Sequence, residues 1–133
     1  DVLDVVIEVD CILTDCWEPE PSICDGLTEV ELWGVTYDIG TTTEIFLNSQ
    51  GLSGSIPSEI GCLTNLTSLN LGGNQLTGEI PSTIGQLTSL YYLRLNWNQL
   101  TGEIPQAVCD LIESNNLNMD WILPGNNLIN TCE

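Results

Sequence analysis

The chain has 133 residues, the size of a single domain, and 19 acidic residues against one basic residue, Arg94, give it a formal net charge of −18. So negative a surface repels nucleic acid phosphates and anionic membranes, and no run of about 18 apolar residues is present that would span a bilayer. We therefore expect no nucleic acid partner and no membrane insertion.

The N-terminal segment predicts a capping helix. Apolar residues recur at helical spacing over residues 2–13, and Asp1 stands where a helix N-cap is expected. The spaced residues are Val2, Val5, Val6, Val9 and Leu13. The acidic start lacks the basic residues of a secretory signal, so we expect a mature or excised segment.

The same residues allow a second interpretation. The stretch Asp1-Val2-Leu3-Asp4-Val5-Val6 resembles the end of a dockerin-like calcium loop and its exiting helix. This resemblance implies Ca²⁺ near Asp1 and Asp4 if the chain is a fragment of a longer protein. Otherwise we expect no cofactor and no metal site.

Acidic residues are concentrated near the N-terminus, where the first 44 residues hold twelve of the 19. Two interpretations stay open: a solvated surface, or a surface that binds divalent cations or a basic partner. Within this region, Leu27, Val30 and Leu32 predict a degenerate half-repeat, and a bend from Gly34 to Gly40 leads into the first full coil.

A 24-residue repeat extends over residues 42–113. The central copy reads Leu66, Leu69, Leu71, Asn74, Leu76, Gly78, Ile80, Pro81, Ile84, Gly85, Leu87, and adding or subtracting 24 returns nearly every apolar position. Three copies in constant register predict a solenoid, because one coil cannot bury its own leucines and stacked coils share a core.

Each copy predicts three short elements. The alternation L-x-x-L-x-L predicts a strand with two inward leucines, after which Asn74 and Asn98 provide amides that can pair backbone groups at the turn. The segment L-x-G-x-I-P predicts a second strand, which Pro81 and Pro105 end because proline has no N–H to donate. The remaining residues predict a helical return.

The full pattern L-x-x-L-x-L-x-x-N-x-L-x-G-x-I-P-x-x-I-G-x-L resembles the plant-type class of leucine-rich repeats. Receptor-kinase ectodomains and polygalacturonase-inhibiting proteins have this repeat, and acidic secreted proteins of bacteria and algae repeat LTGEIP units. The resemblance covers residues 42–111. It implies an α/β solenoid, a right-handed leucine-rich-repeat coil with a parallel sheet on its concave face.

Residues 114–133 predict a C-terminal cap, and residues 1–41 an N-terminal cap, on the three repeats of residues 42–113. Leu117 and Met119 continue the strand leucines, and Asn126-Asn127-Leu128 restores the Asn-x-Leu of the repeat four residues late. Cys109 and Cys132 flank this cap, so we expect a disulfide that stabilises it by roughly 3 kcal/mol.

Six cysteines, no histidine and no CxxC pair favour disulfides and an oxidising compartment over zinc sites. Cys24 falls near the place that Gly61-Cys62 occupies one coil later, and neighbouring coils lie about 5 Å apart. Cys24–Cys62 is therefore favoured, which leaves Cys11–Cys16. The other two pairings of these four cysteines stay open.

Residues between the strand leucines predict a ligand-binding surface on the concave face. Aromatic residues and arginine are common energetic anchors at interfaces. The candidates are Phe46, Asn70, Tyr92, Arg94, Asn96, Trp97, Asn118 and Trp121. Two alternatives stay open: Trp97 and Trp121 stack on each other to shield the cap, or Arg94 pairs with a neighbouring acid.

Catalysis has little support, since the chain has no histidine and no G-x-S-x-G. Glu79 and Glu103 fit a solvent-facing ladder better than a glycosidase pair, and Thr77 and Thr101 with Ser53 are too few for an ice-binding array. Asn65-Leu66-Thr67 is a glycosylation sequon or ordinary repeat sequence.

We therefore expect a secreted or cell-surface protein that is not an enzyme. Its expected function is recognition or adhesion, with a protein or carbohydrate ligand on the concave face. The alternative is a structural subunit that binds copies of itself and forms an extracellular filament, since open-ended solenoids can stack end to end.

Overall fold

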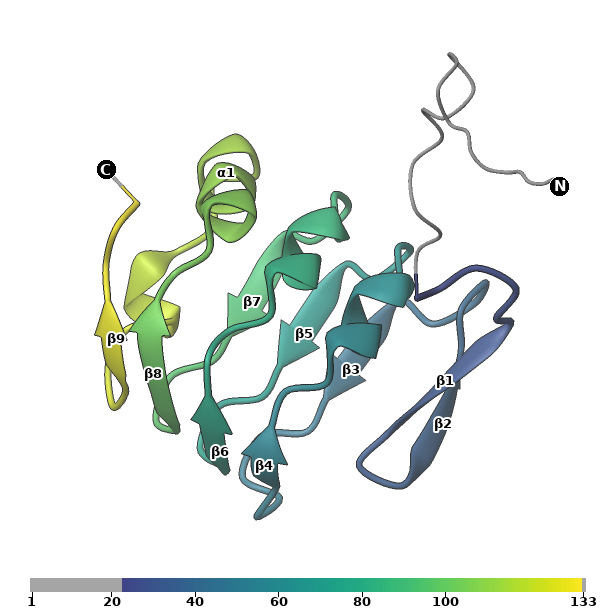
Figure 1. The fold of residues 1–133 in the computed structure, drawn as a ribbon, viewed down its shortest axis with the longest axis horizontal. Helices are drawn as coiled ribbons and strands as arrows, with labels where there is room; N and C mark the ends of the chain where they lie inside the picture. Colours follow the sequence, from purple (N-terminus) through teal and green to yellow (C-terminus); the bar gives the residue numbers. More distant parts are fainter. Residues whose placement is uncertain (1–22, 133) are drawn as a thin grey trace, which may run out of the picture.

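The computed structural model describes residues 23–132. The expected helix over residues 2–13, the Ca²⁺ ligands Asp1 and Asp4, and the Cys11–Cys16 pair lie outside the described residues. Figure 1 shows the described part as coils stacked side by side, from the β1–β2 hairpin at one end to β9 at the other.

The first sheet of the solenoid has three parallel strands in the order β3-β5-β7. These strands are β3 (Glu44–Phe46), β5 (Ser68–Asn70) and β7 (Tyr92–Arg94). Each residue aligns with its equivalent one repeat later, as Phe46 does with Asn70 and Asn70 with Arg94. The leucine spacing therefore places equivalent residues in rows across the sheet.

A second parallel sheet has the order β4-β6-β8-β9. Its strands are β4 (Ser53–Ser55), β6 (Gln75–Gly78), β8 (Gln99–Glu103) and β9 (Asn127–Ile129). The helical returns follow Pro57, Pro81 and Pro105, and they are the 3₁₀ helices η2 (Ser58–Cys62) and η3 (Ser82–Gln86) and the α-helix α1 (Gln106–Ser114). The described residues thus form an α/β solenoid of stacked coils.

The core lies between the two sheets and the helical returns. The repeat leucines Leu69, Leu76 and Leu93 are at most 1% exposed. Glycine allows the helical returns to pack closely: a Cβ added at Gly85 would lie 2.7 Å from the Ala107 carbonyl oxygen. Stacking therefore buries a continuous column of leucines.

Asparagine amides join successive coils inside the turns. Asn74 Oδ1 accepts hydrogen bonds from the backbone N–H groups of Gln50 and Leu52, at 2.9 and 3.1 Å. Asn98 Oδ1 accepts from Leu76 N–H at 3.1 Å, and Asn126 Oδ1 accepts from Leu100 N–H at 3.0 Å. These amides satisfy backbone groups that would otherwise be buried without partners.

The expected N-terminal half-repeat is wrong. Residues Leu27 to Leu32 do not add a strand to the first sheet; β1 (Glu29–Leu32) pairs antiparallel with β2 (Val35–Asp38). The two-residue turn Trp33-Gly34 has positive φ at both positions, 48° and 84°, which is the geometry of a tight hairpin turn. Burial raises the pKa of the Tyr37 hydroxyl in this hairpin.

The C-terminal cap also departs from the expected strand. Leu117 is buried, but Met119 begins the short 3₁₀ helix η4 (Met119–Trp121), so the first sheet has three strands among the described residues and gains none from the cap. A disulfide joins Cys109 in α1 to Cys132, and another joins Cys24 to Cys62 in η2. None of the helices described over residues 23–132 is long and apolar enough to cross a membrane.

Candidate ligand-binding face

The outer face of the first sheet brings together most of the residues predicted from the sequence. We call this surface the aromatic face and define it by Phe46, Tyr92, Arg94 and Trp121 with Asn70 of β5 and the loop residues Asn48, Asn96 and Trp97. Three strands, η4 and the loops after the strands supply these side chains, since strand residues that alternate with buried leucines point outward.

Three aromatic rings form a continuous ladder across the sheet. The ring centroids of Phe46 and Tyr92 lie 6.2 Å apart in an edge-to-face arrangement, although β5 lies between their strands. The Tyr92 and Trp121 centroids lie 5.0 Å apart. Ser68, which aligns with Tyr92 on β5, has a small side chain, and this leaves room for the rings to meet above the middle strand. The ladder therefore links the first coil to the C-terminal cap.

Arg94 is the one basic residue of the sequence, and its guanidinium lies on the aromatic face. Its Cζ atom is 5.2 Å from the centroid of the Trp121 ring, a cation–π distance. Over the part of the chain that the structure describes, Arg94 has no ion pair with a carboxylate. The expectation of a pair with a neighbouring acid thus finds no support there.

A notch of about 220 Å³ adjoins the ladder. Its lining residues are Asn48, Ser49, Asn70, Gly72, Gly73, Arg94, Asn96 and Trp97. The notch exists because Gly72-Gly73 stands in the middle coil where the coils on either side carry Asn48-Ser49 and Asn96-Trp97. We call it the diglycine notch. A Cβ at Gly72 would lie 2.8 Å from Asn96 Oδ1 and one at Gly73 would lie 2.9 Å from Ser49 Oγ, so the two glycines let side chains of the first and third coils approach the middle coil.

Two asparagines in the diglycine notch are buried, Asn70 at 9% and Asn96 at 7% exposure. Asn70 Oδ1 accepts a hydrogen bond from the Gly72 N–H at 3.0 Å. Within residues 23–132, the Asn70 Nδ2 group and both ends of the Asn96 amide have no hydrogen-bond partner. Both residues were expected on this face, but nothing in the sequence indicates that their side chains are buried.

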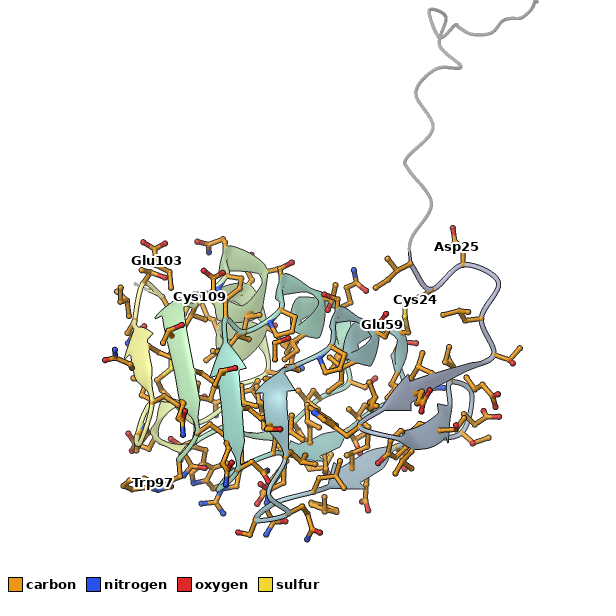
Figure 2. The ribbon with its side chains drawn as sticks, turned by 60° about the horizontal axis from the view of Figure 1, so that its bottom comes forward. Cys24, Asp25, Glu59, Trp97, Glu103 and Cys109 are labelled. Carbon is orange, nitrogen blue, oxygen red and sulfur yellow. A yellow bond between two sulfur atoms is a disulfide. The ribbon has the colours of Figure 1, made fainter. Side chains whose placement is uncertain are left out.

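Trp97 is 62% exposed at the edge of the diglycine notch. Its φ of 60° lies in the left-handed region, as does that of Ser49 at 57° and Gly73 at 71° in the equivalent positions. A bulky residue in this conformation costs roughly 1–2 kcal/mol, and such strain is concentrated at functional sites. Figure 2 shows Trp97 at the lower margin of the solenoid, whereas Glu103 and Cys109 lie at the upper margin.

The expected stacking of Trp97 on Trp121 is absent among the described ring contacts. A Cβ added at Gly125 would clash with the Trp97 ring, so the indole packs directly on the Gly125 backbone. Trp121 instead contacts Tyr92 and Arg94. The remaining candidate, Asn118, lies in the cap, and its Oδ1 accepts a hydrogen bond from Asp120 N–H at 2.9 Å.

A larger groove and the sequon lie elsewhere on the surface. A groove of about 920 Å³ lies between the second sheet and the helical returns, with Glu79 and Glu103 among its lining residues. No group of three or more potential metal ligands occurs among residues 23–132. Asn65 of the sequon is exposed, and its Nδ2 donates a hydrogen bond to the Gly40 carbonyl at 3.0 Å.

Comparison with known proteins agrees with the repeat. Residues 65–87 and 89–111 match the Leucine Rich Repeat family. No curated protein is significantly similar to the chain in sequence.

Solved structures similar to the chain include plant receptor ectodomains. The leucine-rich-repeat ectodomain of the receptor kinase SOBIR1 from Arabidopsis thaliana is 28% identical over 79% of this chain and 57% of its own, with a TM-score of 0.59. The plant peptide hormone receptor RGFR1, in complex with RGF2, is 41% identical over 65% of this chain and 13% of its own, with a TM-score of 0.57. A plant ice-binding protein is 33% identical over 65% of this chain and 27% of its own, with a TM-score of 0.54. The chain thus spans 13–57% of the length of these three proteins.

Proposed function

We propose that the chain is a non-catalytic extracellular recognition or adhesion module that holds a protein or glycan ligand on the aromatic face. The observation that carries this proposal is the ring ladder of Phe46, Tyr92 and Trp121 beside an Arg94 that has no ion pair within the described chain. Exposed aromatic rings and arginine supply much of the binding energy at protein interfaces.

Charge and similarity support the same proposal. On a chain with a formal charge of −18, a lone guanidinium gives a local site for an electronegative group, and the surrounding charge repels polyanions. A similar solved structure is a plant peptide hormone receptor with its peptide, which supports ligand binding by coils of this kind. We assign the coils to the plant-type 24-residue class and the module to a secreted or cell-surface location.

The test is binding of the intact chain to peptide and neutral glycan arrays. We expect discrete ligands, and we expect Arg94→Ala and Tyr92→Ala to weaken binding at least tenfold, because each removes an anchor of the aromatic face. Gln99→Ala, an exposed change on the second sheet, is the matched control and should bind as the parent does. Equal binding by all four forms would reject the aromatic face.

The alternative function is self-association into a filament. One observation favours it: β4 and β9, the outer strands of the second sheet, contain no charged residue. Uncharged edge strands are templates for pairing with another chain. Electron microscopy separates the two functions, since fibres support self-association and discrete particles support recognition.

A further inference from the structure

We propose that the diglycine notch is a subsite for one neutral sugar unit of the ligand. This inference rests on the proposed function, because it assigns a chemical class to part of the aromatic face. It begins from the unpaired amides of Asn70 and Asn96, since buried polar groups in folded proteins are nearly always hydrogen-bonded and each exception calls for an explanation.

The unpaired groups define what the ligand must offer. Asn96 presents a free carbonyl oxygen and a free NH₂ group, Asn70 presents a free NH₂ group, and the Arg94 guanidinium presents only donors. A ligand that satisfies all three residues must therefore both donate and accept hydrogen bonds within one small volume. By contrast, the amide of Asn98, two residues beyond Asn96, is hydrogen-bonded at both ends. Its Oδ1 accepts from the Leu76 N–H, and its Nδ2 donates to the Leu71 and Leu95 carbonyls.

Sugar hydroxyls meet this requirement, because each hydroxyl donates one hydrogen bond and accepts others. A carboxylate only accepts, so it would pair with Arg94 but leave the Asn96 oxygen without a donor. The charge of −18 further disfavours acidic sugars, whose polymers the surface would repel. The chemistry of the notch therefore matches a neutral sugar better than an anionic group.

The shape of the notch agrees with this assignment. Gly72 forms its floor, and a Cβ there would lie 2.8 Å from Asn96 Oδ1, so the middle coil has no room for a side chain at this position. Trp97 borders the notch with an exposed indole, which provides an apolar surface for the C–H face of a sugar ring. Trp97 has the same left-handed φ as Gly73, its equivalent in the middle coil, so the two positions differ in their side chains.

The experiment is calorimetric titration of the intact chain with neutral oligosaccharides of glucose, mannose, galactose and xylose. N-acetylasparagine amide and oligogalacturonate serve as the carboxamide and carboxylate probes. We expect at least one neutral oligosaccharide to bind, Asn96→Ala to weaken it at least tenfold, and Gly72→Ala to weaken it similarly by displacing the Asn96 amide. Gln99→Ala should leave the affinity unchanged, and a thermal melt of each variant verifies its fold.

Three results would overturn the inference. They are no binding by any neutral oligosaccharide, equal affinity of the parent and a folded Asn96→Ala chain, or binding of the carboxamide or carboxylate probe in place of sugars. Each leaves the proposed function intact if Arg94→Ala and Tyr92→Ala still weaken a peptide ligand. If those two variants also have no effect, the proposed function fails as well.

Discussion

Asn98→Ala should destabilise the chain much more than Asn96→Ala, although both amides are buried and lie two residues apart. Asn98 Oδ1 accepts from Leu76 N–H at 3.1 Å, and its Nδ2 donates to the carbonyls of Leu71 and Leu95 at 2.9 and 3.0 Å. Loss of the amide removes these three hydrogen bonds; the Leu71 and Leu95 carbonyls still accept from Asn74 and Asn126 Nδ2, whereas the Leu76 N–H loses its side-chain acceptor. At about 1 kcal/mol for each hydrogen bond lost, the free energy of unfolding falls by about 3 kcal/mol.

Asn96→Ala removes no hydrogen bond of its side chain among the described residues, so we expect the free energy of unfolding to change by less than about 1 kcal/mol. Urea denaturation measures both values, and an unchanged m-value verifies that the two variants unfold in the same way. In thermal melts, Asn98→Ala should lower Tm by roughly 12 °C, at about 4 °C per kcal/mol for a chain of this size. Equal decreases in the free energy of unfolding of the two variants would refute the distinction between the bonded amide of Asn98 and the unpaired amide of Asn96.

Four further predictions concern the rest of the fold. Cys109→Ser with Cys132→Ser should cost roughly 3 kcal/mol in urea denaturation, because the bond closes a loop with a sequence separation of 23. Gly85→Ala should cost about 1–3 kcal/mol, since its Cβ would lie 2.7 Å from the Ala107 carbonyl oxygen; an unchanged midpoint would contradict that packing. The raised pKa of Tyr37 favours its neutral form in the folded chain, so stability should fall as the pH rises above the ordinary value of 10.0, and Tyr37→Phe should reduce this loss. Thermal hysteresis should be absent, because the row of Ser53, Thr77 and Thr101 is too short for an ice-binding array, and measurable hysteresis would prove this wrong.

The coils could be predicted because their determinants are local and repeated. Apolar residues in the L-x-x-L-x-L spacing, an amide residue at the turn and a proline after the second strand recur every 24 residues, so strands and helical returns follow from spacing alone. The register of the first sheet also follows, which is why Phe46, Tyr92 and Arg94 were correctly expected on one strand face.

The ends could not be predicted in the same way, because their residues fit more than one element. The spacing of Leu27, Val30 and Leu32 suits a repeat strand, but alternation also suits an antiparallel strand, and the Trp33-Gly34 turn selects the hairpin. At the other end, Asn118 accepts from Asp120 N–H and thereby caps a 3₁₀ helix where the leucine spacing predicts a strand.

The diglycine notch could not be predicted from the sequence, because it depends on side chains of three coils. Gly72-Gly73 reads as an ordinary turn, and only the stacked structure shows that Asn96 and Trp97 of the next coil line a notch beside it. The contact between Trp97 and Gly125 likewise joins residues of different coils. The sequence did show that one copy alone has glycines where the coils on either side have side chains.

The central claim is that ligands bind on the aromatic face, and NMR mapping with an array-selected ligand tests it most directly. Amide and indole resonances of the isotopically labelled chain are followed during titration. We predict that the largest shifts occur at Tyr92, Arg94 and Asn96 and at the indoles of Trp97 and Trp121, while β4 and β6 change little. Shifts confined to the second sheet or to the ends of the solenoid would contradict the account.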